Sequence, residues 1–468
     1  MFRPYHQSAA LVRSWLRLRL VSLSSTRHHL PGTPSLQRAT RAIHRPVPHK
    51  SWLPRRLRLW RPPPVSKRRR PTPRIPPTTR ATISSTWCAS LPVYFTEVKD
   101  PCSVAFVANI LVLEPWYRGS HRKWLDGWRS TSKHQINIIE GPDTGWRRSL
   151  LISPARFAEA IAESSAQIDA LVASTPIDLA TVMGLLDPSI SRPPTLLYMH
   201  ESQIGYPPGP KGGRAHGGII NDWRSIFAAD RVAVATRFHE NVLMKQMPPF
   251  VEQLIEGAGA KLENKLSNIE LLPVGIDTSR LAPTTVTGPL KVMWNHRWSY
   301  DKGPGEFAHA LSVLAGEGHE FDVYALGEVE RSGRRAYERL LNRLNDRVIL
   351  CGYQEEDAYL GALCRSDLVV SSAQHDFFGL AVAEAIAAGA RPLLPQRLAY
   401  PEIVPEALQA TLLYETGLIE ALRSVLTTPR ELLHQHRSTT MAHVAAFSWS
   451  KLAPKYDGLI DDMIAARS

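Results

Sequence analysis

The sequence predicts an α/β protein with two doubly wound, Rossmann-like domains, preceded by a basic arm that forms no packed core. From Ser103 onward, short apolar segments alternate with helical patterns, which is typical of βαβ units and parallel sheets. The polar stretch 281–288 separates these segments into two groups. By contrast, residues 1–80 hold 19 Lys and Arg and no Asp or Glu.

The arm differs in charge from the rest of the chain. The 468 residues have a formal net charge of +13, but residues 81–468 hold 37 basic and 43 acidic side chains, a balance of −6. Blocks of like charge and frequent prolines resist compaction. We therefore expect residues 1–100 to be a disordered Arg- and Pro-rich arm.

Four interpretations of the arm stay open. It is a non-functional extension, a mitochondrial presequence, an RNA-attracting tail or a nuclear address. The presequence would use Met1–Leu30, which is acid-free and contains a possible basic amphipathic helix at Leu11–Leu23. Clustered cations attract phosphates whatever the RNA sequence, and Lys67–Arg70 fits a nuclear address.

Buried parallel strands are predicted where short apolar segments end at turn or polar residues. In the first domain, residues 103–283, they are Val104–Leu113, Thr195–Met199, Arg231–Ala235 and Ile269–Pro273. In the second domain, residues 288–448, they are Leu290–Trp294, Asp322–Leu326, Val348–Cys351, Leu368–Ser371 and Arg391–Leu394. Ligands of such sheets bind beyond the carboxyl ends of the strands, so the loops that follow strands are the candidate sites.

Composition and missing motifs exclude several classes of protein. The four cysteines form no CxxC pair, which is typical of an intracellular protein without a disulfide framework. The longest apolar run, 104–113, is about half as long as a membrane helix, so no transmembrane segment is predicted. The P-loop, nucleophile-elbow and zincin motifs are missing. No Asp-x-Asp triplet occurs either, so we expect neither a metal nor another cofactor.

The segment Asp376–Ala385 places two acidic residues around a glycine at the predicted start of a helix. Asp376 and Glu384 are eight residues apart, with Gly379 between them. Backbone N–H groups at a helix N-terminus receive anionic or hydroxylated ligands, and carboxylates accept hydrogen bonds from vicinal sugar hydroxyls. An acidic helix cap with a solvated Glu384 is the simpler interpretation, and this segment alone leaves both open.

Cations and small residues follow other predicted strands. Arg297 and Lys302 lie five residues apart after Leu290–Trp294 and can converge on a diphosphate, although exposed pairs of cations are common. Gly119 and Ser120 follow the opening strand and can present backbone donors to a ligand. A lone histidine is more often structural, but the position of His200 at a strand end favours a site. These candidate residues all lie in strand-end loops.

Together these segments resemble the GT-B superfamily of glycosyltransferases, in its large retaining class. The E-x7-E motif of that class reads Asp376-x7-Glu384 here, and its Arg-x4-Lys pair reads Arg297 and Lys302. The resemblance implies two Rossmann-like domains that face a cleft. Residues 449–468 resemble the terminal helix of the superfamily, which returns to the first domain.

A narrower resemblance is to the tRNA-queuosine mannosyltransferase family. It rests on five segments that occur in the same order over roughly residues 104–465. They are Glu114–His121, Tyr198–Gln203, His296-Arg297-Trp298 with Lys302, His375–Gly379 and Tyr400–Ile403. The resemblance implies transfer of mannose from GDP-mannose to queuosine in the anticodon of tRNA-Asp, with retention of configuration.

The same resemblance implies a role for each candidate residue. Arg297 and Lys302 would neutralise the leaving diphosphate. Asp376 would hold the hexose hydroxyls, Glu384 the ribose hydroxyls, and His200 the sugar. The other donor-binding residues would be Gly119, Ser120 and His121 of the first, acceptor domain, and Gly352, Tyr353, Phe378, Gly379 and Leu380 of the second.

Three departures from the family pattern concern the phosphate-facing turn, the sugar and the acceptor. Arg118 stands where the family usually has a second glycine, and Asp376 replaces a glutamate. The Lys-x-Trp-x-Trp-Arg stretch of the family is reduced to Gly145–Arg148.

Two other functions stay open. The first is a retaining GT-B glycosyltransferase with a lipid, glycan or small-molecule acceptor. The second is a non-catalytic RNA-binding protein on a GT-B scaffold, which would be favoured if Arg297, Lys302 and Glu384 failed to converge. The expected partners are a nucleotide sugar and tRNA, and the expected location is the cytoplasm, or the mitochondrion if the arm is a presequence. No feature predicts an oligomeric state.

Overall fold

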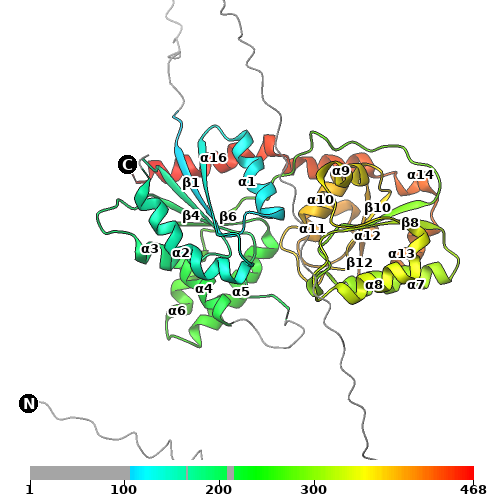
Figure 1. The fold of residues 1–468 in the computed structure, drawn as a ribbon, viewed down its shortest axis with the longest axis horizontal. Coiled ribbons are helices and arrows are strands. Elements are labelled where there is room, and N and C mark those ends of the chain that lie inside the picture. The colour runs from blue at the N-terminus through cyan, green and yellow to red at the C-terminus, as the bar shows by residue number, and fades with distance from the viewer. Residues whose placement is uncertain (1–105, 165–166, 208–215, 468) are drawn as a thin grey trace, which may run out of the picture. The chain divides into compact units, whose positions relative to one another are not determined.

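The computed structural model describes residues 106–164, 167–207 and 216–467, and the predicted arm lies outside these residues. The described chain forms two parallel six-stranded sheets flanked by helices (Figure 1). The prediction of two Rossmann-like α/β domains is therefore confirmed. No helix in the described ranges has the length and apolar content needed to cross a bilayer.

The sheet of the first domain has the strand order β2-β1-β3-β4-β5-β6. Its strands are β1 (Asn109–Glu114), β2 (Gln135–Glu140), β3 (Ala170–Ser174), β4 (Thr195–Met199), β5 (Arg231–Val234) and β6 (Glu270–Leu271). Its helices are α1 (Gly119–Thr131), α2 (Trp146–Glu163), α3 (Leu179–Leu185), α4 (His216–Ala228), α5 (Arg237–Glu252) and α6 (Ala258–Leu266). The strand order reverses direction between β1 and β3, and the carboxyl ends of such a pair are where open α/β sheets bind ligands.

The sheet of the second domain has the order β12-β11-β10-β7-β8-β9. Its strands are β7 (Leu290–Trp294), β8 (Phe321–Leu326), β9 (Val348–Gly352), β10 (Leu368–Val370), β11 (Arg391–Pro395) and β12 (Leu413–Tyr414). The helices are α7 (Pro304–Gly316), α8 (Arg334–Leu344), α9 (Glu356–Cys364), α10 (Leu380–Ala387), α11 (Tyr400–Ile403), α12 (Gln409–Leu412), α13 (Leu418–Leu426), α14 (Arg430–Leu433), α15 (Arg437–Val444) and α16 (Trp449–Ala465). Here the switch point lies between β7 and β10.

Two differences from the sequence prediction concern the first sheet. The first strand begins at Asn109, because Phe106 and Val107 are 55% and 58% exposed and precede the buried part of the apolar run. Strands β2 and β3 were not predicted. Strand β2 pairs with β1 alone, so several of its side chains are exposed and no continuous buried run marks it.

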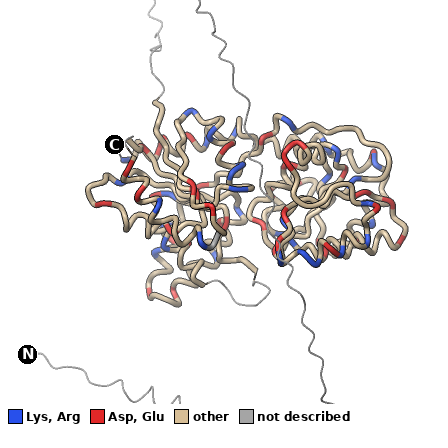
Figure 2. Tube along the Cα trace, in the orientation of Figure 1, with Lys and Arg blue, Asp and Glu red and all other residues tan. Residues whose placement is uncertain are grey.

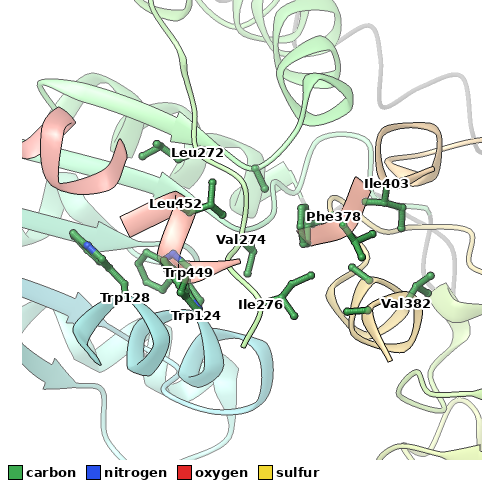
Figure 3. Packing of buried hydrophobic residues seen from close by; sticks show 14 of the residues in the cluster. Trp124, Trp128, Leu272, Val274, Ile276, Phe378, Val382, Ile403, Trp449 and Leu452 are labelled. Atoms are coloured by element: carbon green, nitrogen blue, oxygen red, sulfur yellow. The ribbon is translucent and has the colours of Figure 1, made fainter. Parts of the chain in front are cut away.

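One hydrophobic cluster continues from the first domain through the linker between β6 and β7 into the second domain, as Figure 3 shows from Trp128 to Val382. Trp449, at the start of α16, is 4% exposed and lies between Gly127 of α1 and Gly275 of the linker. A Cβ atom would lie 1.9 Å from Trp449 at Gly127 and 2.2 Å from it at Gly275. Only glycine lets the indole approach both backbones this closely.

Polar contacts fix α16 against α1. The indole of Trp124 donates to the Tyr456 hydroxyl at 3.1 Å, and the indole of Trp128 donates to Asp457 at 3.0 Å. Tyr456 also donates to the carbonyl of Pro273 at 3.0 Å. The last helix of the described chain thus packs on the first domain, next to the helix that carries Gly119–His121.

Candidate functional site

The loop after β7 carries Arg297 and Lys302 at the switch point of the second sheet. It ends in a short 3-10 turn, Tyr300–Lys302, and Gly303 with φ 66° then starts α7. Arg297 is half exposed and donates to Glu330 at 2.6 Å, whereas Lys302 is nearly buried. Both cations flank the buried carboxylate of Asp301, at 3.8 and 3.9 Å. The predicted cation pair is therefore held on one rigid turn.

The loop after β10 brings Asp376 to the same switch point. The Lys302 ammonium donates to the Asp376 carboxylate at 3.1 Å and to the carbonyl of His375 at 2.7 Å. Burial is the largest single influence and raises the pKa of Asp376, but the charge and hydrogen bond of Lys302, with contributions from His296 and His375, together bring the pKa below its usual value. Asp376 is thus an ionised acceptor, as a carboxylate that binds sugar hydroxyls must be.

Gly379 converts this loop into the start of α10. Its φ of 89° is a left-handed conformation, and an added Cβ would lie 3.1 Å from the Tyr400 ring. Phe378 is buried and packs edge-on against Phe447, at 5.4 Å between ring centroids. Leu380 is the first residue of α10, so unpaired N–H groups follow at this end of the helix.

Glu384 lies in α10 and is bound by a cation from the first domain. Lys123 of α1 donates to its carboxylate at 2.5 Å, and the Tyr359 hydroxyl of α9 donates to the other oxygen at 2.6 Å. The Lys123 ammonium also lies 4.6 Å from the centre of the Tyr359 ring. Asn295, in the loop after β7, donates to Tyr359 at 3.3 Å and to the Ala381 carbonyl at 2.7 Å. Glu384 is therefore connected to the Arg297–Lys302 loop.

Gly352 and Tyr353 lie at the carboxyl end of β9, on the flank of this site. Gly352 has φ 74°, and its carbonyl accepts from the N–H of Gly327 at 2.9 Å. Gly327 in turn lies against the backbone of His296. The Tyr353 ring is 71% exposed, so it is available to cover a planar ligand at this edge.

The turn after β1 places Gly119, Ser120 and His121 at the switch point of the first sheet. Gly119 starts α1 with φ 53°, and both Gly119 and Ser120 are exposed. His121 Nδ1 lies 3.1 and 3.2 Å from the two oxygens of the buried Glu114. Burial is the largest single influence and opposes protonation of His121, but the charge and hydrogen bond of Glu114, with a smaller contribution from Glu201, together raise the histidine's pKa. The pair supplies a positive imidazolium beside an exposed helix N-terminus.

His200, after β4, stacks on His121 with 4.1 Å between ring centroids. Its backbone N–H donates to Thr175 at 3.1 Å, while its Nε2 has no hydrogen-bond partner within the described ranges. Burial, with a smaller contribution from the charge of His121, holds the pKa of His200 well below its usual value. A neutral imidazole with a free buried nitrogen can bind a sugar hydroxyl.

Ligand atoms of Glu114, His121 and His200 lie within 4.8 Å of one another, a spacing that a metal ion could bridge. In this structure, however, Nδ1 of His121 faces the Glu114 carboxylate, which also accepts from the Trp116 N–H at 2.8 Å. Glu114 and His121 are therefore already arranged as a hydrogen-bonded ion pair.

The loops of both domains meet near these groups. Thr236, which caps α5, donates to the Phe377 carbonyl at 2.7 Å, and the His239 ring stacks on Phe377 at 3.8 Å. Glu402 of α11 accepts from the backbone N–H groups of Arg237 and Phe238 at 2.9 and 2.7 Å. A carboxylate of the second domain thus caps a helix of the first.

Several site residues were not predicted as functional from the sequence. Lys123, Asn295 and Tyr359 surround Glu384, although they are 261, 89 and 25 residues away from it in the chain. Lys123 reaches Glu384 only through the packing of the two domains, and Asn295 and Tyr359 come near it only through the tertiary fold of the second domain, so no local pattern signals these contacts. Glu114 could have been found, because an acid at the end of a buried strand, seven residues before a histidine, is a detectable pairing.

Two family models match the chain. The model described as tRNA-queuosine alpha-mannosyltransferase N-terminal matches residues 109–276. The model described as Glycosyl transferases group 1 matches residues 278–440. The two matches are adjacent and together include both sheets.

Two named relatives support these matches. A tRNA-queuosine alpha-mannosyltransferase from Drosophila melanogaster is 28% identical over 374 residues, which cover 76% of this chain and 97% of the relative. A GDP-mannose:cellobiosyl-diphosphopolyprenol alpha-mannosyltransferase from Xanthomonas campestris is 23% identical over 206 residues, which cover 43% of this chain and 53% of the relative.

Solved structures show the same fold. A sucrose-phosphate synthase from Thermosynechococcus elongatus aligns with a TM-score of 0.62 at 16% identity, over 77% of this chain and 100% of that one. Anabaena HepE in complex with UDP and glucose aligns with a TM-score of 0.56 at 13% identity, over 76% and 100%. The chain is therefore a glycosyltransferase with the GT-B fold, and its first domain is similar to the N-terminal part of tRNA-queuosine alpha-mannosyltransferases.

Proposed function

We propose that the protein transfers mannose from GDP-mannose to queuosine in the anticodon of tRNA-Asp, with retention of configuration. The observation that carries the proposal is the match of residues 109–276 to the tRNA-queuosine alpha-mannosyltransferase N-terminal model. A relative of that name from Drosophila melanogaster aligns over 97% of its length. The two-domain arrangement of cations and carboxylates supports transfer from a nucleotide sugar.

The diphosphate of the donor would bind between the two switch points. Arg297 and Lys302 approach it from the second domain, and the imidazolium of His121 and the N-terminus of α1 approach it from the first. Negative charge develops on the diphosphate as the sugar leaves, so positive groups fixed in advance lower the barrier. Lys302 is best placed, because Asp301, Asp376 and the His375 carbonyl already hold its ammonium.

The hydroxyls of the donor would bind the carboxylates. Asp376 accepts from the mannose hydroxyls, and the neutral His200 binds the same sugar from the first domain. Glu384 accepts from the ribose hydroxyls. Lys123 occupies one of its oxygens in this structure, so ribose binding displaces that ammonium. Gly352 and the exposed Tyr353 lie beside the base.

In the transfer step, the bond between mannose C1 and the β-phosphate oxygen breaks, and GDP leaves. A new bond forms between C1 and a hydroxyl oxygen of the queuosine cyclopentene-diol, on the same face of the sugar. The hydroxyl proton passes to the leaving phosphate oxygen. The protein holds both substrates and the developing charge in place, and closure of the domains excludes water.

We further propose that the reaction needs no metal, because cationic side chains from both domains can neutralise the diphosphate. Dialysis against a chelator should leave mannose transfer unchanged. Loss of activity that added Mn²⁺ or Zn²⁺ restores would contradict this and direct attention to the three residues Glu114, His121 and His200.

The test is transfer of radiolabelled mannose by the full-length protein to tRNA-Asp with and without queuosine. Label is expected only in the queuosine-containing tRNA, with inhibition by GDP and not by UDP. The matched control is Lys302→Ala, which should incorporate no label. If neither tRNA were labelled but GDP-mannose were hydrolysed in a Lys302-dependent way, the proposed acceptor would be wrong. The protein would then be a glycosyltransferase with a different acceptor: a lipid, a glycan or a small molecule.

We propose a cytoplasmic location, where tRNA and nucleotide sugars meet. Cys351 and Cys364 are free thiols in the structure, as expected in a reducing compartment. Fluorescent fusions of the full chain and of a chain without residues 1–80 should both stay in the cytoplasm. Mitochondrial import of the full chain alone would show that the arm is a presequence.

A further inference from the structure

Helix α8 carries an unusual concentration of unpaired arginines. Between residues 331 and 343 there are five arginines and one acid, Glu338, a net charge of +4. The arginines are Arg331, Arg334, Arg335, Arg339 and Arg343, and all five are exposed. None of their guanidinium groups forms an ion pair or a hydrogen bond with the part of the chain that the structure describes. Basic positions are drawn in blue in Figure 2.

The spacing of these residues makes a stripe. Arg335, Arg339 and Arg343 recur every fourth residue, so they follow one another along one side of the helix over about 12 Å. The side about 100° further round the helix, with Ala336, Leu340 and Leu344, is buried against the second sheet's core. The stripe therefore faces away from the domain and is available to a partner.

Several arginines elsewhere in the body are ion-paired. Arg231 pairs with Glu270 at 3.5 Å, Arg280 with Asp357 at 2.5 Å, and Arg423 with Glu317 at 2.8 Å. On α8, by contrast, like charges at i and i+4 repel and cost a few tenths of a kcal/mol each. A helix face that only contacts solvent gains nothing from clustered arginines, whereas a surface that binds an anionic polymer gains attraction from them.

The stripe begins beside the donor site. The segment Glu328–Gly333 leads into α8 and is hydrogen-bonded to the loop after β7, through Trp298 N–H to the Glu328 carbonyl at 2.8 Å. Ser332 accepts from the N–H of Tyr300 at 3.2 Å, and Glu330 binds Arg297 at 2.6 Å. The arginines thus extend from the Arg297–Lys302 turn along the surface of the second domain.

We infer that the α8 arginine stripe, Arg335, Arg339 and Arg343, binds the phosphate backbone of the acceptor RNA while its modified nucleoside enters the donor site. The inference rests on the proposed tRNA acceptor and adds the surface that holds it. Guanidinium forks bind phosphates with two parallel hydrogen bonds. Such contacts position the RNA without reading its sequence, so the stripe contributes affinity and the site contributes the choice of nucleoside.

The test compares two full-length variants that lose the same charge. The stripe variant is Arg335→Gln/Arg339→Gln/Arg343→Gln, and the control is Arg231→Gln/Arg280→Gln/Arg423→Gln, in which each lost arginine was ion-paired. Glutamine is a good helix former, and circular dichroism checks that both variants fold. Binding of tRNA-Asp is measured against salt concentration, and mannose transfer is measured against tRNA and GDP-mannose concentration. The basic arm is the same in both proteins, so its contribution cancels.

We expect the stripe variant to bind tRNA at least about tenfold more weakly than the control at moderate salt, with a log-affinity against log-salt slope lower by about 2. The loss should be equal for tRNA with and without queuosine, and the KM for GDP-mannose should not change. Equal tRNA binding by the two variants would overturn the inference. Binding of both variants to phosphatidylserine vesicles is measured as well, and the inference would also fail if the stripe variant lost affinity for the vesicles and not for tRNA. If the wild type bound tRNA but labelled none, the proposed function would fail while the binding comparison still decided the role of the stripe.

Discussion

The ion pair between Lys302 and Asp376 joins the two loops that the second sheet brings together at its switch point. Each group sets the state of the other: Lys302 keeps the carboxylate ionised, and Asp376 fixes the ammonium where a diphosphate would bind. Glu384 and Lys123 form a second pair, which crosses between the domains. At the scale of single residues, the proposed donor site therefore consists of acids and cations that already hold one another in place.

Replacement of Lys302 by alanine should lower kcat by about 100-fold or more, because the charge on the leaving diphosphate would lose its best-ordered cation. The replacement also removes the largest of the contributions that lower the pKa of Asp376, so this carboxylate would protonate at a higher pH. Steady-state kinetics with GDP-mannose and tRNA measure the effect. Lys451→Ala, an exposed change in α16, is the control and should behave as the wild type. An unchanged kcat in Lys302→Ala would contradict the assigned role.

Helix α16 connects the end of the described chain to the first domain, and its attachment depends on small residues. Trp449 lies against Gly127 and Gly275 in the cluster that runs through both domains. The N-terminus of helix α1 carries proposed donor-binding residues, and its buried face packs against α16. A change in the packing of Trp449 would therefore shift the position of Gly119–His121.

Gly127→Ala should lower the melting temperature, because the new methyl group would lie 1.9 Å from the Trp449 indole and force it to move. We expect a loss of about 1–3 kcal/mol, as for other overpacked cores. The matched control is Gly458→Ala within α16, where nothing lies within 4 Å of the new methyl group. Alanine there should stabilise the helix by up to about 1 kcal/mol. Thermal unfolding of the two variants should therefore shift in opposite directions, and equal shifts would count against the packing.

The limits of sequence-based prediction are visible at this scale. The strands with continuous apolar runs, such as β4 and β7, and the loops that follow them could be predicted because their signals are local. The partners of the predicted residues could not. Lys123 with Glu384, and Glu402 with the first turn of α5, are contacts between residues more than 160 positions apart, and they form only when the two domains are packed. The edge strand β2 was missed because it lacks a continuous buried run.

At the scale of the whole molecule, three buried histidines make stability depend on pH. Burial lowers the pKa of His239 to about 3 and the pKa values of His296 and His375 to about 4. The three are neutral when folded, whereas an unfolded histidine protonates near pH 6.5. The unfolded chain therefore takes up more protons as the pH falls from about 6.5 towards 4, and stability is lost over this window.

Unfolding measured by denaturant at pH 6.5 and 5.0 should show this loss, at up to about 1.4 kcal/mol per pH unit for each histidine. His239→Gln should reduce the slope, because glutamine does not titrate, whatever its effect on stability at a single pH. A slope unchanged by His239→Gln would contradict the assignment.

Nucleoside analysis of the product tests most directly whether the chain adds mannose to queuosine, as we propose. tRNA-Asp is incubated with the full-length protein and GDP-mannose, digested to nucleosides and analysed by mass spectrometry. We expect queuosine to gain one hexose, which an α-mannosidase removes and a β-mannosidase does not. Unmodified queuosine, together with a hexose on another nucleoside or on none, would contradict the claim.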